Sequence, residues 1–65
     1  MNSLSKYDGE RVRIKDTYGK IWEGLVLLYD YPDDNDNGVE SLTVEISSTK
    51  IYEFYPDDIA EIEII

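Results

Sequence analysis

Apolar and charged residues alternate along the chain from position 11 to position 15. Valine and isoleucine form one side of this pattern, and the other side is basic and consists of Arg11, Arg13 and Lys15. A period of two is typical of a strand with one buried and one solvated face. Residues 16–19 then predict a tight turn, because Gly19 tolerates the positive φ that a hairpin end requires.

A second, long strand is expected from Lys20 to about Tyr29. Gly24 lies at its middle, where a glycine usually marks a bulge or a sharp bend. A strand bent there can serve both halves of a barrel. The continuous apolar run from Leu25 to Leu28 predicts that part of this strand is covered on both faces.

The composition changes between Asp30 and Gly38, where nearly every residue is acidic or turn-forming, and this segment is expected to be a long loop. Three further strands are expected over residues 40–47, 51–55 and 59–65, with a tight turn at residues 56–58. Isoleucines near the end of the chain favour a strand over a helix there. Ser3 is the expected cap of a single helical turn within the first nine residues.

The chain is predicted to be one all-β domain, because 65 residues leave room for a single core that buries about 60% of its unfolded surface. Cysteine and histidine are both absent, so no disulfide, thiolate metal site or histidine base is available. We therefore expect no enzymatic activity, no metal and no cofactor. No apolar run approaches the ~20 residues that cross a bilayer, so a cytoplasmic protein without membrane contact is expected.

Six basic and fifteen acidic residues give a net charge of −9, which disfavours nonspecific binding to nucleic acids. Four of the basic residues lie between positions 11 and 20, so a local basic face can still form on this acidic chain. The acidic loop contains Asp33-x-Asn35-x-Asn37-Gly38, which matches the first half of a calcium loop. The position of the bidentate glutamate is Val44, so we interpret the segment as a solvated turn.

Eight aromatic residues are many for a chain of this length. Trp22, Tyr29 and Phe54 are expected to supply core volume. Tyr31 and Tyr55 stand at loop edges, where burial is less expected, and are the candidates for stacking on unpaired bases.

The order of residues resembles the first motif of the Sm and Lsm family, with Val12-x-Ile14 followed by Gly19-Lys20-x-Trp22-x-Gly24-x-Val26-x-x-Tyr29-Asp30. The segment Phe54-Tyr55-Pro56-Asp57-Asp58-Ile59 is similar to the second motif in its apolar ends and in Asp57. There, Tyr55, Pro56 and Asp58 replace the family's Arg, Gly and Asn. The resemblance covers about residues 11 to 65 and indicates a divergent bacterial or phage member.

The resemblance implies a short N-terminal helix and a strongly bent, five-stranded antiparallel barrel. It also implies a ring of protomers, joined by the fourth strand of one and the fifth strand of the next. RNA in this family is bound at an inner rim, where the expected Asn position holds Asp34 and the Arg position holds Tyr55. RNA binding is therefore expected to be altered or lost, and its candidate residues are Tyr31, Asn35, Tyr55, Arg11 and Arg13.

Two functions remain open from the sequence. The first is a homo-oligomeric ring that binds single-stranded RNA weakly, with a predicted interface of Ile51, Tyr52, Phe54, Ile62 and Ile64. The second is an acidic protein-interaction module, such as an immunity protein or a nucleic-acid mimic, that binds a basic partner protein. Small barrels of the Src-homology-three type share much of the strand pattern, so fold alone does not choose between these functions.

Overall fold

The computed structural model describes residues 3–65 and contains five strands and three short 3₁₀ turns. The strands are β1 (Arg11–Asp16), β2 (Ile21–Asp30), β3 (Ser41–Ser47), β4 (Lys50–Phe54) and β5 (Ile59–Ile64). The turns are η1 (Leu4–Tyr7), η2 (Pro32–Asp34) and η3 (Pro56–Asp58). The five predicted strands are confirmed, and each boundary agrees with the periodicity of the sequence to within one residue.

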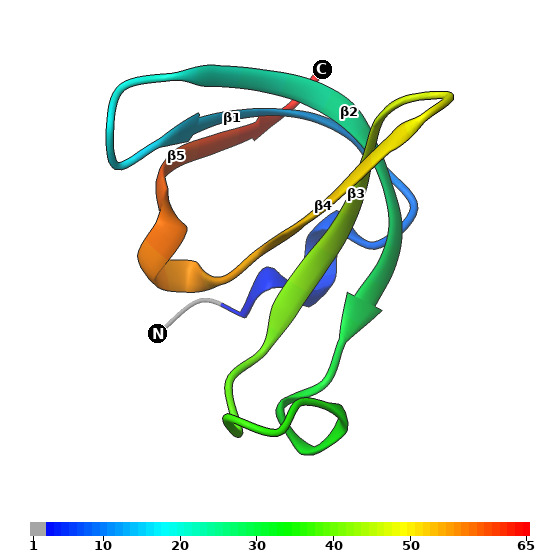
Figure 1. The fold of residues 1–65 in the computed structure, drawn as a ribbon, viewed down its shortest axis with the longest axis vertical. Helices are drawn as coiled ribbons and strands as arrows, with labels where there is room; N and C mark the ends of the chain where they lie inside the picture. Colours follow the sequence, from blue (N-terminus) through cyan, green and yellow to red (C-terminus); the bar gives the residue numbers. More distant parts are fainter. Residues whose placement is uncertain (1–2) are drawn as a thin grey trace.

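All five strands form one antiparallel sheet in the order β4-β3-β2-β1-β5. The sheet is strongly bent, as predicted, but it is not closed, because β4 and β5 are joined through η3 without pairing (Figure 1). β2 pairs with β1 through its first half and with β3 through its second half, and Leu25 has partners on both strands. The two edges of the sheet are therefore β4 and β5.

Gly24 lies at the bend of β2, as expected. A Cβ atom at this position would collide with the backbone carbonyl oxygen of Glu45 on β3. Only glycine lets the two backbones approach this closely. The β1–β2 turn also follows the prediction, because Gly19 adopts a φ of 87°.

The core lies inside the bend of the sheet and is built from alternate residues of β1 to β4. Its fully buried apolar side chains are Val12, Ile14, Val26, Leu42 and Val44. Tyr29 and Phe54 are also buried, as predicted, while Trp22 is half-buried and packs against the cluster. This inward set confirms the alternation seen in the sequence for β1 and β3.

The prediction that the run Leu25–Leu28 is covered on both faces is wrong. Leu27 is 44% exposed and Leu28 is 53% exposed. The register of the β2–β3 pairing shifts between Val26 and Leu28, so Leu27 is an extra residue without a partner. Beyond this bulge the outer face of β2 has no second layer to cover it.

The N-terminal turn η1 closes one end of the sheet. Ser3 caps it, as predicted, because its hydroxyl accepts a hydrogen bond from the backbone N–H of Ser5. Glu40, the residue before β3, also holds this turn. Its Oε1 accepts hydrogen bonds from Ser3, from Leu4 N and from Tyr29 OH. Within residues 3–65 no helix has the length and apolar character needed to cross a membrane.

Candidate functional site

Polar side chains from β2, β3 and β4 meet where these strands approach the long loop. The Ser41 hydroxyl is fully buried and lies 3.2 Å from Asp30 Oδ2 and 2.9 Å from Glu53 Oε2. Thr43 donates to the same Asp30 oxygen at 2.8 Å. Asp30 and Ser41 are direct partners in the β2–β3 register, so the strand pairing itself assembles this cluster.

Two of the candidate RNA-binding residues join the cluster. Asn35 Nδ2 donates to Ser41 Oγ at 3.0 Å and to Val39 O at 2.6 Å. The Tyr55 hydroxyl donates to Glu53 Oε1 at 2.8 Å, and this hydrogen bond together with partial burial raises the pKa of Tyr55. The structure therefore brings Asn35 and Tyr55 into one hydrogen-bonded chain through Ser41 and Glu53.

The chemistry of this cluster favours internal structure over anion binding. Asp30 and Glu53 present carboxylate oxygens, and an incoming phosphate would meet negative charge there. The Ser41 hydroxyl is buried and has a single proton between two carboxylates, so it does not face solvent as a nucleophile. Among the described residues, every buried side-chain nitrogen or oxygen atom has a hydrogen-bond partner.

Tyr31, the other aromatic candidate, is exposed and outside this hydrogen-bonded chain. Its ring packs edge-on against Tyr29, with centroids 5.0 Å apart. A face of Tyr31 remains accessible for stacking, because the contact with Tyr29 is T-shaped.

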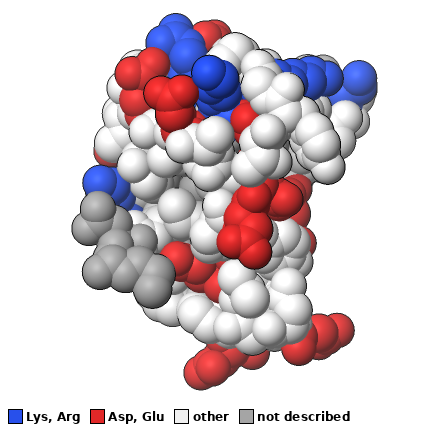
Figure 2. Space-filling view, turned by 90° about the vertical axis from the view of Figure 1, so that its left-hand side faces the viewer, with Lys and Arg blue, Asp and Glu red and all other residues white. Residues whose placement is uncertain are grey.

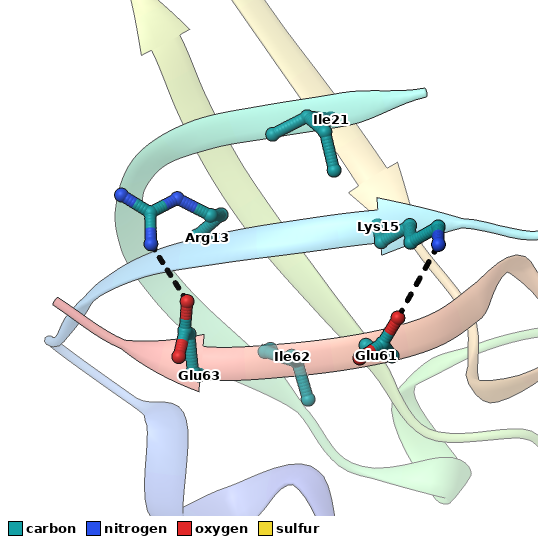
Figure 3. Close-up of a pocket in the computed structure, with 6 residues that line it drawn as sticks. All are labelled: Arg13, Lys15, Ile21, Glu61, Ile62 and Glu63. Carbon is teal, nitrogen blue, oxygen red and sulfur yellow. Dashed lines mark hydrogen bonds and ion pairs between the residues drawn. The ribbon is translucent and has the colours of Figure 1, made fainter. Parts of the chain in front are cut away.

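Two basic residues of β1, Arg13 and Lys15, form ion pairs with acidic residues of the neighbouring strands. Arg13 donates from Nε to Glu23 on β2 and from Nη1 to Glu63 on β5, both at 2.7 Å, and Figure 3 shows the contact with Glu63. These two hydrogen bonds raise the pKa of Arg13 and keep it charged but paired. Lys15 lies 3.5 Å from Glu61 in the same arrangement. On the basic face that the sequence allowed, Arg13 and Lys15 therefore take part in cross-strand ion pairs, which surround the hollow drawn in Figure 3.

Arg11 is exposed at the start of β1, opposite Leu25 in the β1–β2 register. The structure does not join it to Asn35 or Tyr55 through any hydrogen bond that it records among residues 3–65. The five candidate RNA-binding residues therefore fall into separate groups rather than into one pocket.

The acidic loop uses its amides to hold its own backbone. Asn37 Oδ1 accepts from Val39 N at 3.1 Å, and Asn35 binds Val39 O as described above. Residues 3–65 contain no group of three or more acidic side chains arranged to hold a metal ion.

The residues of the predicted oligomer interface lie on the two edge strands, β4 and β5. Ile51 and Tyr52 on β4 and Ile64 on β5 are exposed, and Ile62 is half-buried. Phe54 belongs to the core of the chain itself, so only its backbone is available at the edge. Of the predicted interface residues, Tyr52, Phe54, Ile62 and Ile64 lie opposite buried residues in the strand register, which places them on the core face.

The structure also contains a hollow of about 230 Å³ that the sequence did not indicate. Trp22, Tyr52 and Phe54 form its aromatic floor, with Trp22 meeting the other two rings edge-on at 5.0 and 5.7 Å. Asp16 and Asp58 line its rim, and Glu53 borders it while both of its carboxylate oxygens accept hydrogen bonds from Ser41 and Tyr55. Trp22 and Phe54 were expected in the core and Tyr52 at an oligomer interface, so the sequence analysis did not bring the three rings together.

Comparison with known families, with curated proteins and with solved structures finds no match. The resemblance to the Sm and Lsm proteins is therefore carried by the residues of this chain alone. The arguments on function below rest on the geometry of its edges, charges and cavities.

Proposed function

We propose that this chain is a non-enzymatic, Sm-like protein that assembles into a homo-oligomeric ring through β4 and β5, with RNA binding altered or lost. One observation carries the proposal. The fully buried apolar side chains all lie on the inner strands β1, β2 and β3, whereas Tyr52 on β4 is 40% exposed and Ile64 on β5 is 50% exposed. The core is uncovered at the two edges where the sheet fails to close.

In a closed ring, pairing of β4 of each copy with β5 of the next would cover both edges of every copy. The unpaired backbone groups of an edge strand favour association with another strand, and neither edge carries a proline within its strand. Burying one isoleucine side chain contributes about 1.5–3 kcal/mol. Each copy carries a charge of −9, which opposes assembly, but this repulsion is screened within about 8 Å at physiological salt.

The test is the mass of the purified protein in solution, measured by light scattering at tens of micromolar. We expect the wild type to be oligomeric and Ile64→Lys to shift it towards the monomer, because a charge at the edge is costly to bury. Ile21→Lys is the matched control, since Ile21 is similarly exposed at 52% but lies on β2 away from both edges. Raising the salt concentration should favour the wild-type oligomer.

A folded wild type that stays monomeric at this concentration would contradict the ring. An equal effect of Ile64→Lys and Ile21→Lys would contradict the assignment of the interface to the edges. Circular dichroism on each variant separates lost assembly from lost folding.

A second candidate function is an acidic interaction module that binds a basic partner protein. Two observations favour it: at the lower end of the face in Figure 2 the charged side chains are all acidic, and the aromatic hollow is rimmed by carboxylates. Basic residues on the same face gather towards the opposite end. Such a separation of charge orients a basic partner on approach.

A further inference from the structure

The aromatic hollow is held open by three segments that are distant in the sequence. The β1–β2 turn forms one wall, β4 forms the floor with Trp22, and η3 forms the other wall. A hydrogen bond of 3.2 Å from Thr17 N to Asp58 O ties the turn to η3. The walls are therefore fixed relative to each other in the chain as it stands.

Two carboxylates at the rim are positioned by hydrogen bonds to the chain. Asp16 accepts from Trp22 Nε1 at 3.0 Å, and this contact lowers the pKa of Asp16, so its carboxylate is charged at neutral pH. Asp58 Oδ2 accepts from Tyr55 N at 2.9 Å. Each carboxylate has about four lone-pair sites, so Asp16 and Asp58 retain capacity for a further donor.

The indole ring of Trp22 already attracts a cation within the chain. The ammonium group of Lys20 lies 4.2 Å from the centroid of this ring. Tryptophan provides the strongest cation–π partner among the aromatic side chains. Aromatic faces on the floor and carboxylates on the rim together make a site whose chemistry favours a planar cation.

We infer that this hollow binds an arginine side chain from a basic segment of a partner protein. The guanidinium group is planar, stacks on aromatic rings and donates through a fork to carboxylates, whereas a lysine ammonium is more strongly hydrated. The charge of −9 attracts such a segment from a distance. This inference rests on the second candidate function, and Tyr52 of the hollow also lies on the β4 edge that the ring would use.

Fluorescence of Trp22 provides a direct test, because it is the single tryptophan of the chain. The probe is a labelled peptide with two arginines among glycines and serines, and matched peptides carry citrulline or lysine at both positions. We expect a saturable change in tryptophan emission with the arginine peptide. Affinity for the citrulline and lysine peptides should be lower by about fivefold or more.

Two variants locate the binding. Asp58→Asn keeps an oxygen acceptor for Tyr55 N but removes the charge from the rim, and Tyr52→Ala removes an exposed ring from the floor. Asp36→Asn is the matched control, because it removes one charge from the acidic loop, outside the hollow. We expect both hollow variants to weaken arginine-peptide binding by about fivefold or more, and Asp36→Asn to change it by less than about twofold.

The outcomes separate the two claims. If no basic peptide binds by anisotropy of the label, both the interaction module and the arginine site are overturned. If the peptide binds but Asp58→Asn and Asp36→Asn behave alike and the Trp22 emission is unchanged, the module survives and the hollow is not its site. Equal binding of the lysine and arginine peptides would overturn arginine as the ligand.

Discussion

Gly24 is the residue on which the shape of the sheet depends most directly. The β2 strand bends there because the backbone of β3 approaches closer to it than any side chain permits. The bend lets one strand pair with both β1 and β3 around a small core. The absence of a side chain at Gly24 therefore permits the close approach of β2 and β3 within the five-stranded sheet.

We predict that Gly24→Ala destabilises the fold by about 1–3 kcal/mol, because the added methyl group displaces the Glu45 carbonyl. The measurement is the midpoint of urea unfolding. Leu28→Ala is the control on the same strand, and its effect should stay within about 0.5 kcal/mol because this side chain is exposed. Equal losses in the two variants would show that the close approach at Gly24 is not what the bend requires.

At the scale of elements, the carboxylate of Glu40 joins η1 to the sheet by hydrogen bonds. Burial raises the pKa of Glu40, but hydrogen bonds from Tyr29, Leu4 N and Ser3 outweigh this effect and leave the pKa below its ordinary value of 4.5. A carboxyl group whose pKa is lowered by folding stabilises the folded state above its unfolded pKa. That contribution is lost as the pH falls through the folded pKa.

We predict that Glu40→Gln lowers stability at pH 7 by about 1.5 kcal/mol, the low end of the range for a hydrogen bond to a charged group. The difference in thermal midpoint between wild type and variant should shrink as the pH falls below 4.5. Thermal melts at several pH values measure it. Asp36→Asn, which removes one charge but none of the hydrogen bonds of Glu40, should show no such convergence, and a difference independent of pH would contradict the role of Glu40.

For the molecule as a whole, the capacity to bind RNA depends on which basic residues are paired more than on how many there are. Arg13, the most central cation of the expected basic face, lies between Glu23 and Glu63. An arginine paired twice has few donors left for a phosphate. The net charge of −9 adds a repulsive field around this neutralised strand.

We predict that an oligo-uridine RNA binds no more tightly than ~10 μM at physiological salt, measured by fluorescence anisotropy. The double variant Glu23→Gln with Glu63→Gln changes the net charge from −9 to −7 and releases Arg13 from both ion pairs. RNA binding to that variant should tighten and depend more on salt. A sub-micromolar, salt-sensitive affinity of the wild type would contradict the prediction and identify β1 as a phosphate-binding strand.

The sequence by itself determined the strands, the turns and the N-terminal cap, because these depend on neighbours within a few residues. Alternation of apolar and charged side chains marks β1 and β3, and Gly19 and Ser3 mark a turn and a cap by local backbone chemistry. The bend at Gly24 was also visible, because a glycine inside a strand has few other reasons to be there.

Only the tertiary structure decided which side chains are free to act. The exposure of Leu27 follows from a bulge in the β2–β3 register, which the apolar run did not reveal. Arg13 is neutralised by Glu63, which is fifty residues away in the sequence. The contact between Trp22 and Tyr52 in the hollow also joins residues distant in the sequence. Such contacts depend on strand register and strand order, which no local periodicity encodes.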